Sequence, residues 1–278
     1  MAETVDLRAL IARLPPETVV RGDASRAVCA IESDSRRIVP GALFVALRGE
    51  HSDGHAFVAQ AVAAGAAAVV VDAAVPVASE TVAIAVSDTR RALSTLAAAF
   101  YGDPSHALDV VGVTGTNGKT TTVHMLRGIL EEAGIPSGTI GTVGASFGAQ
   151  DRALAHTTPL PPELHALLAG MRDDGARAVA MEVSSHALAL GRVDDVRFRV
   201  GVLTNVTRDH LDFHQTREAY AAAKRRLFDI SAEAVLNAGD PLGAQWAREL
   251  AAAGVRVTTY GEREGAELVA TGVEASPE

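Results

Sequence analysis

The chain has 278 residues, of which 48% are apolar and 21% charged, a composition that predicts two globular domains with ample core. A net charge of -9 leaves no broad basic face, which excludes nucleic acid as an expected partner, and the single cysteine, Cys29, excludes a disulfide framework or a thiolate metal cluster. The N-terminus does not read as a signal peptide and no apolar stretch is long enough for a membrane span, so we expect a cytoplasmic protein with no membrane partner.

The first part of the chain alternates short apolar runs with helical patterns. Helices are expected at about 55–64 and 88–100. The segment 101–106 combines Gly, Asp, Pro and Ser and is typical of a linker. We therefore predict a first domain over residues 1–104 and a second over 105–278. The strands of the first domain are expected at 28–33, 42–47, 66–71 and 81–86.

The second part repeats the alternation with longer elements. Continuous apolar strands separated by helices predict an α/β fold with a mainly parallel sheet covered on both faces. The chain stops just after a further strand, so we expect an incomplete domain. Strands are expected at 108–115, 176–183, 199–206, 232–239 and 255–260, and helices at 119–133, after 159–163, near 216–228 and up to about 253.

A glycine-rich loop at 112–122, "GVTGTNGKTTT", follows a predicted strand and opens a predicted helix. Its glycines stand at every third position, and Val113 occupies the place of the first glycine of the common P-loop pattern. Backbone N–H groups of such a loop can face phosphates, Lys119 can reach the β- and γ-oxygens, and Thr120 can hold Mg²⁺. A turn that binds nothing is the alternative, which the lysine and the run of threonines make less favoured.

Polar side chains follow the next two predicted strands. Taken singly, each has an ordinary explanation as a solvated carboxylate, a helix N-cap or a structural histidine. Together they gather at the carboxyl ends of parallel strands, where open α/β sheets bind ligands, and this favours a site with oxygen ligands for Mg²⁺. The residues are Glu182 after one strand, and Asn205, Asp209, His210, Asp212 and His214 after the other.

Five segments stand in the order and spacing of the Mur ligases, and the chain resembles that family from about residue 25 onward. The N-terminal stretch 33–57 looks like the family's uridine-nucleotide-binding domain. The resemblance implies a small UDP-substrate-binding domain followed by a P-loop ATPase-type central domain, without the family's third, C-terminal domain. The five segments are "GVTGTNGKTTT", "HTTP", "MEVSSHALALGRV", "TNVTRDHLDFH" and "AYAAAKRRLF".

The segment "EVSSHAL" resembles the MurE branch, which adds the third amino acid of the peptidoglycan stem peptide to UDP-N-acetylmuramoyl-L-alanyl-D-glutamate. The resemblance implies ATP and Mg²⁺ as cofactors, an acyl phosphate intermediate and a monomer. The added diamino acid, meso-diaminopimelate or L-lysine, stays open. We expect this fragment alone to bind nucleotide weakly and to be inactive as a ligase. Alternatives are a MurF-type ligase, another amide ligase such as a folylpolyglutamate synthase, and a nucleotide-binding scaffold without activity.

The resemblance also implies roles for individual residues. The residues expected around ATP are Gly115, Thr116, Asn117, Gly118, Lys119, Thr120, Thr121, Asn205 and Asp209. The magnesium ligands are Thr120, Glu182, His210 and Lys224, the last as a carbamate, and the catalytic set is Lys119, Glu182, His210 and Lys224. The residues expected around the UDP-linked substrate are Ser33, Ser35, Glu50, His51, Ser52, Thr157, Thr158, Ser184 and Arg192.

Two positions carry particular weight. On pattern alone Lys224 is one of three consecutive cations on a solvated helix face, and only the resemblance makes it a carbamylated metal ligand. Leu190 stands where the family usually places a glutamine whose amide contacts the substrate. A leucine can neither donate nor accept, so we expect one hydrogen bond to the substrate to be lost.

Overall fold

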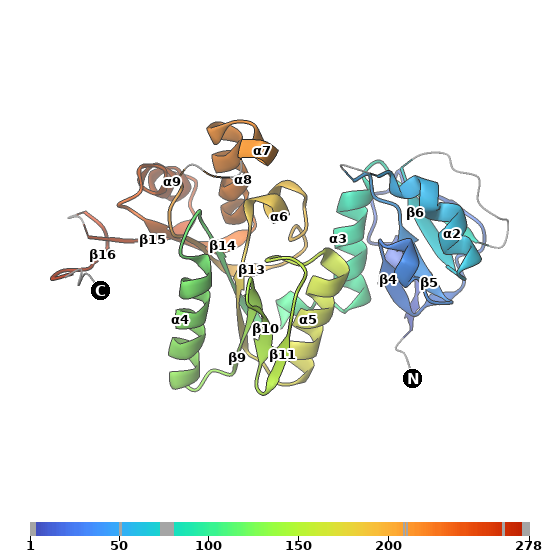
Figure 1. Cartoon of the computed structure of the whole chain (residues 1–278), viewed down its shortest axis with the longest axis horizontal. Helices are drawn as coiled ribbons and strands as arrows, with labels where there is room; N and C mark the ends of the chain where they lie inside the picture. Colours follow the sequence, from blue (N-terminus) through green and yellow to red (C-terminus); the bar gives the residue numbers. More distant parts are fainter. Residues whose placement is uncertain are drawn as a thin grey trace. The chain divides into compact units, whose positions relative to one another are not determined.

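The structure, a computed structural model, describes residues 4–49, 52–72, 81–207, 209, 211–262 and 265–273. The chain forms two compact units (Figure 1). The first contains Met1–Asp103 with Pro161–Ala166 and Gly191–Asp195, and the second contains Pro104–Leu160, Leu167–Leu190 and Val196–Glu278. Within the described residues, no helix combines the length and the apolar character needed to span a bilayer.

The first unit is built on a five-stranded sheet that is parallel except for strand β2 at one edge. The strand order is β2 (Val19–Arg21), β7 (Val82–Ala85), β6 (Ala68–Val71), β5 (Ala42–Val45) and β4 (Ala30–Glu32). Strands β1 (Val5–Asp6) and β3 (Ala27–Val28) form a separate antiparallel pair. The helices are α1 (Leu7–Ile11), α2 (Val58–Ala63) and α3 (Thr89–Phe100), with 3₁₀ turns at Ser35–Arg37 and Gly54–Phe57.

Both faces of this sheet are buried, as the continuous apolar runs predict. Leu43 of β5 belongs to a core cluster that includes Leu93 of α3. Its neighbour Phe44, which points to the opposite face, packs in a second cluster with Val58 and Ala61 of α2. Helices therefore cover the sheet on both sides.

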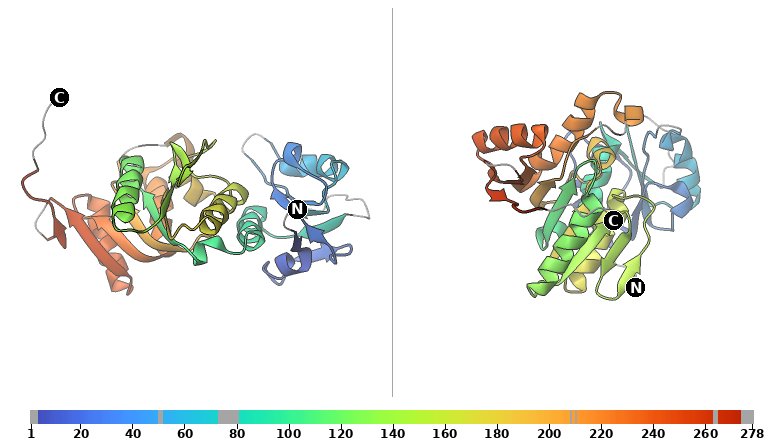
Figure 2. Two further views of the ribbon diagram at one scale, coloured as in Figure 1. Left: turned by 90° about the horizontal axis from the view of Figure 1, so that it is seen from below. Right: turned by 60° about the vertical axis from the view of Figure 1, so that its left-hand side comes forward.

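The second unit contains a nine-stranded sheet, parallel from β9 to β16, with an antiparallel hairpin at one edge (Figures 1 and 2). The strand order is β11 (Gln150–Arg152), β10 (Gly144–Phe147), β9 (Ser137–Gly141), β12 (Ala178–Glu182), β8 (Asp109–Thr114), β13 (Phe198–Leu203), β14 (Ser231–Asn237), β15 (Arg256–Gly261) and β16 (Leu268–Val269). The helices are α4 (Lys119–Glu132), α6 (Ser185–Ala189), α7 (Leu211–His214), α8 (Arg217–Asp229) and α9 (Pro241–Ala252), with the part of α5 (Pro161–Asp173) that follows Ala166.

Helices α4 and α8 cover opposite faces of the central strands. Val113 of β8 packs in one cluster with Val123 of α4. Its neighbour Gly112 faces the other way, where an added Cβ would lie 2.7 Å from the ring of Phe198 and 3.0 Å from Leu227 of α8. A side chain at Gly112 would thus push α8 away from the sheet.

The predicted fold class, α/β with mainly parallel sheets, is confirmed. The predicted strands and helices are present within a few residues of the expected bounds. Strands β9, β10 and β11 were not predicted, because the segment 137–152 is rich in Gly, Ser and Thr and has no continuous apolar run.

Candidate functional site

The glycine-rich loop connects β8 to α4 at the carboxyl edge of the nine-stranded sheet. Gly118 occupies the N-cap of α4 with φ of 86°, and no side chain caps this end of the helix. Gly115 has φ of 149°, and an added Cβ would overlap with Oγ1 of Thr204. The loop conformation therefore requires glycine at both positions and leaves the amide groups at the start of α4 directed outward, as an anion site needs.

Lys119 is folded back over this loop. Its Nζ donates to the carbonyl oxygens of Gly115 and Thr116, both at 2.9 Å. Burial lowers the pKa of Lys119, an effect that the negative charges of Glu182 and Asp209 oppose. The amine is thus held beside the loop by backbone oxygens.

Glu182 ends strand β12 and is almost fully buried. Its Oε1 accepts hydrogen bonds from Thr120 Oγ1 at 2.9 Å and from the Thr142 N–H at 2.8 Å, and its Oε2 accepts from Thr142 Oγ1 at 3.3 Å. A Cβ at Gly141 would overlap with Glu182 Oε1, so a glycine is needed beside this carboxylate. The predicted neighbours Thr120 and Glu182 therefore lie in direct contact.

The loop after β13 is fastened to the glycine-rich loop. Asn205 Oδ1 accepts from the Asn117 N–H and its Nδ2 donates to the Asn117 carbonyl, both at 3.1 Å. Thr116 N–H donates to the Asn205 carbonyl at 2.8 Å. Thr204 Oγ1 also donates to the Asn117 carbonyl, at 2.6 Å. These bonds hold the predicted ATP-binding residues of two strand ends together.

Lys224 of α8 lies 1% exposed on the other side of the loop. Its Nζ donates to the Gly115 carbonyl at 2.8 Å and lies 4.4 Å from the centre of the Tyr220 ring. Burial, together with the positive charge of Lys119, lowers the pKa of Lys224 to about 7. The expectation of a solvated helix face from pattern alone is wrong, because the side chain points into the unit.

The expected substrate residues of the second unit also lie at this edge. Thr158 Oγ1 donates to the Glu182 carbonyl at 2.9 Å and accepts from the Ser184 N–H at 3.1 Å. Thr157 and Thr142 share a hydroxyl–hydroxyl contact of 3.1 Å. These contacts bring Thr157, Thr158 and Ser184 together with the magnesium candidates Thr120 and Glu182 at one edge of the sheet.

The remaining predicted residues fall elsewhere. Arg192 belongs to the first unit, where burial is the main cause of its lowered pKa and the charge of Arg90 adds to it. Thr121 is exposed on the first turn of α4, and Asp209 is partly buried. In the first unit, Ser33 and Ser35 follow β4 and Ser52 follows β5. The predicted residues that lie outside the described part of the chain are Glu50, His51 and His210.

Sequence reasoning missed three residues that the structure places in the site. Thr142 donates twice to Glu182, and Thr204 bridges two loops. The Tyr220 hydroxyl lies 3.1 Å from Thr116 Oγ1, which also accepts from the Thr207 N–H at 2.9 Å. A threonine or tyrosine in a sequence carries no local sign of such contacts, although Tyr220 does stand four residues before Lys224, one helical turn away.

The donor set fits a magnesium nucleotide. Oxygen atoms of Thr120 and Glu182 lie 2.9 Å apart beside an uncapped helix start, and hard oxygen ligands are those Mg²⁺ prefers. Within the described residues, no group of three or more His, Cys, Asp and Glu side chains is placed to hold a metal. Further ligands would have to come from phosphate oxygens, water or residues outside that set.

Comparison with known proteins identifies the family. The Mur ligase middle domain matches residues 113–278, which is more than half of the chain, and the Mur ligase catalytic domain matches residues 28–101. The chain belongs to the Mur ligase family. The resemblance inferred from the sequence motifs is thereby confirmed.

Individual Mur ligases are similar over most of the chain. A UDP-N-acetylmuramoyl-L-alanyl-D-glutamate--2,6-diaminopimelate ligase of Chlorobaculum tepidum is 49% identical over 235 residues, which are 83% of this chain and 46% of that protein. The ligase of the same name from Geobacter sulfurreducens is 47% identical over 218 residues, 78% of this chain and 43% of that protein. The chain thus spans about half the length of these curated relatives.

Solved structures agree with this Mur ligase assignment. A structure of UDP-N-acetylmuramoyl-L-alanyl-D-glutamate--2,6-diaminopimelate ligase superposes with a TM-score of 0.80 at 26% identity, over 95% of this chain and 54% of that one. A MurF from Acinetobacter baumannii superposes with a TM-score of 0.69, also at 26% identity, over 98% of this chain and 56% of that one.

Proposed function

We propose that this chain is the nucleotide- and UDP-substrate-binding part of an ATP-dependent ligase that joins 2,6-diaminopimelate to UDP-N-acetylmuramoyl-L-alanyl-D-glutamate in the cytoplasm. The observation that carries the proposal is the convergence of the uncapped glycine loop, Lys119, the Thr120–Glu182 pair and buried Lys224 at one sheet edge. The names of the relatives supply the substrate and the amino acid.

The reaction divides into two steps. The γ-phosphoryl group of ATP passes to the side-chain carboxylate of D-glutamate, which gives an acyl phosphate and ADP. The amine of diaminopimelate then attacks the acyl carbon, and phosphate leaves from the tetrahedral intermediate as the amide forms. Both steps depend mainly on positioning and on neutralising charge.

The residues at the carboxyl edge of the nine-stranded sheet, here called the loop edge, have separate tasks in this proposal. The outward amides at the start of α4 bind the phosphate oxygens, and Lys119 moves from the carbonyl oxygens of its own loop to the β- and γ-phosphates. Thr120 and Glu182 would hold Mg²⁺, which supplies charge neutralisation at the phosphates when bound. Asn205 holds the loop that these groups share.

Lys224 is assigned the role of a carbamate. Its amine is buried beside the loop, within 2.8 Å of the Gly115 carbonyl, where a cation would repel a metal ion. A pKa of about 7 leaves a large share of the amine neutral near neutral pH, and only a neutral amine adds to carbon dioxide, with loss of a proton. The resulting carbamate supplies an anionic oxygen ligand from a long side chain.

On the substrate side, Thr157, Thr158 and Ser184 would bind the peptide end of the UDP-linked substrate, next to Glu182. The serines of the first unit, Ser33, Ser35 and Ser52, would bind its uridine diphosphate end. This assignment follows the family motifs.

Calorimetric titration of the purified chain tests the proposal. Magnesium with a non-hydrolysable ATP analogue and UDP-N-acetylmuramoyl-L-alanyl-D-glutamate should each bind. Lys119→Ala should weaken the nucleotide by at least about tenfold, since a charge-assisted contact to phosphate is lost, and should leave the UDP-substrate Kd unchanged. Failure of the wild-type chain to bind either ligand would overturn the proposal, and binding without any substrate-dependent ADP release by the ligase would favour a scaffold.

A further inference from the structure

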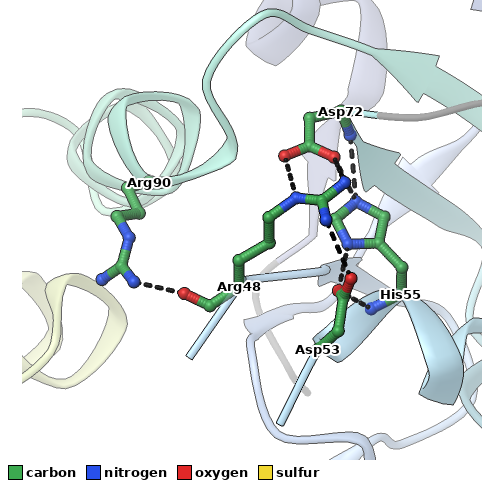
Figure 3. A network of polar contacts seen from close by, with 5 residues as sticks. All are labelled: Arg48, Asp53, His55, Asp72 and Arg90. Atoms are coloured by element: carbon green, nitrogen blue, oxygen red, sulfur yellow. Dashed lines mark hydrogen bonds and ion pairs between the residues drawn. The ribbon is translucent and has the colours of Figure 1, made fainter. Parts of the chain in front are cut away.

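At the carboxyl edge of the five-stranded sheet, four side chains form a closed network, here called the clasp: Arg48, Asp53, His55 and Asp72 (Figure 3). Arg48 and Asp53 lie after β5, His55 stands at the start of the 3₁₀ turn Gly54–Phe57, and Asp72 directly follows β6. The family motifs assign no role to this network as a unit. It joins the ends of two neighbouring strands where open α/β sheets bind their ligands.

Arg48 is the centre of the charged contacts. Its Nε and Nη2 donate to the two carboxylate oxygens of Asp72 at 3.0 and 2.9 Å, and its Nη1 donates to Asp53 Oδ2 at 3.0 Å. The forked geometry fixes both the distance and the orientation of the two aspartates. A lysine at this position would keep the charge and lose the fork.

His55 closes the network from the buried side, with 7% of its side chain exposed. Its Nδ1 lies 2.6 Å from Asp53 Oδ1, and its Nε2 accepts from the Asp72 backbone N–H at 3.1 Å. Nε2 also lies 3.0 Å from Asp72 Oδ1, so the ring contacts both carboxylates of the network. The ring therefore ties the chain after β5 to the end of β6.

Beside the clasp, two backbone segments, Leu47–Gly49 and Ser52–Gly54, lie close together and are here called the neck. Gly49 N–H donates to the Ser52 carbonyl at 2.9 Å, and Gly54 N–H donates to the Leu47 carbonyl at 2.8 Å. An added Cβ at Gly54 would lie 2.7 Å from both N and O of Leu47, so the two backbone segments of the neck lie as close together as glycine permits. The exposed Ser52 lies on this neck.

The energetics point to binding more than to stability. Asp53 and the Arg48 side chain, which is 56% exposed, lie at the surface, and ion pairs in such positions add little to the free energy of unfolding. A network of this kind can still restrict the conformations of a short loop. Restricting a binding loop before the ligand arrives reduces the entropy lost on binding.

We propose that Arg48 and His55 are positioning residues for the UDP-linked substrate: the clasp fixes the neck formed by Leu47–Gly49 and Ser52–Gly54, so that Ser52 is presented in its binding position. This inference rests on the proposed function, since the ligand is the UDP-N-acetylmuramoyl-dipeptide of that reaction. Arg48 and His55 would act on the substrate through the neck, without touching it themselves.

Two clasp variants and one control test the inference in the purified chain. His55→Asn should raise the Kd for UDP-N-acetylmuramoyl-L-alanyl-D-glutamate by about tenfold, and Arg48→Lys by about fivefold, because each loses one fixing contact. The control, Arg13→Lys, breaks a similar two-pronged pair with Asp103 in the same unit, at 2.8 and 3.1 Å, and should leave this Kd unchanged. The affinity for the magnesium-bound ATP analogue should stay unchanged in all three.

The outcomes separate the alternatives. If the wild-type chain binds the UDP-linked substrate and both clasp variants bind it equally well, the inference is wrong and the proposed function stands. If the wild-type chain does not bind it, the proposed function fails at this step. If a variant loses affinity for both ligands together with a drop in thermal midpoint, the clasp is only structural and the inference is overturned. Arg48→Lys, at a largely exposed side chain, decides the matter if His55→Asn does not fold.

Discussion

At the carboxyl edge of the five-stranded sheet, the Arg48 cation is shared by two aspartates, whereas at that of the nine-stranded sheet the amines of Lys119 and Lys224 donate to loop carbonyls. The first arrangement pairs one cation with two carboxylates near the surface. The second holds two cations close enough that Lys119 lowers the pKa of Lys224. Paired charges at the first edge suit the proposed fixing of a backbone segment, and two neighbouring amines at the second suit the proposed binding of an anion.

The largest expected effect concerns the edge of the nine-stranded sheet. Lys224→Ala in the ligase that contains this chain should abolish amide formation, because the proposed carbamate ligand is lost, and should leave UDP-substrate binding nearly intact. The measurement is ADP release that depends on the UDP-linked substrate and diaminopimelate. A short-chain carboxylic acid should partly restore activity by supplying an oxygen ligand. Near-normal turnover of Lys224→Ala would show that the carbamate assignment is wrong.

Two glycine variants, one at each edge, test whether the two edges bind different ligands. Gly115→Ala places a Cβ against Thr204 Oγ1, and Gly54→Ala places one 2.7 Å from the Leu47 backbone. The first should weaken the ATP analogue, and the second the UDP-linked substrate, each by at least about tenfold, with the other ligand unaffected. Gly128→Ala, where an added Cβ meets nothing within 4 Å, is the control. Equal losses of affinity for both ligands in either variant would show that the two edges do not bind separate ligands.

Burying the charge of Lys224 should destabilise the folded chain, so that replacing this lysine by an apolar residue should raise the free energy of unfolding. Its pKa in the folded chain is about 7 against 10.5 as the ordinary value, so between these values the unfolded chain binds more protons and stability rises with pH. Lys224→Met should therefore raise the free energy of unfolding by about 2–4 kcal/mol at pH 7, and by less as the pH approaches 10.

Urea titrations at pH 7 and 9.5 in buffer free of carbon dioxide measure this gain. Arg226→Met, at an exposed position of the same helix, should show no comparable change. A gain that stays constant between the two pH values would mean that the buried charge is not its source.

The sequence located the loop edge because its parts follow a local rule: polar residues after apolar strands, and glycines before a lysine at a helix start. Glu182 and Asn205 were found in this way. Thr142, Thr204 and Tyr220 were not, because their contacts join segments far apart in the chain. The clasp was missed for the same reason: Asp72 lies 17 residues from His55, and only the pairing of β5 with β6 brings them together.

A buried histidine in the first unit should make the stability of the chain depend on pH. His165 is fully buried, and its two ring nitrogens make no hydrogen bond within the described part of the chain. Burial lowers the pKa of His165 to about 4 from 6.5, so the unfolded chain binds more protons in this window and stability falls as the pH drops from 6.5 to 4.

In His165→Leu, the loss in free energy of unfolding on going from pH 7 to pH 4 should be smaller than in the wild-type chain by about 1–3 kcal/mol. Unfolding free energies at pH 7 and pH 4 measure it, with His106→Leu at an exposed position as the control. The same pH dependence in His165→Leu and the wild-type chain would contradict the prediction.

The smallest expected effect concerns Leu190, which ends α6 and is partly buried. Its N–H donates to the His186 carbonyl at 2.9 Å, and the same short helix is capped by Ser184, a proposed substrate residue. A glutamine side chain at this helix end adds a donor and an acceptor where leucine offers neither. One hydrogen bond contributes about 0.5–1.5 kcal/mol net, which corresponds to a factor of about 2 to 12 in affinity.

Leu190→Gln should therefore lower the KM for the UDP-linked substrate within that range and leave kcat nearly unchanged, because the contact is made equally in the ground and transition states. Leu190→Met, which changes shape without adding a polar group, should leave the KM close to that of the wild-type ligase. An unchanged or higher KM in Leu190→Gln would mean that this position packs against the protein rather than facing the substrate. In that case the leucine belongs to a repacked helix end, and the charged and hydroxyl groups around Glu182 would hold the peptide without it.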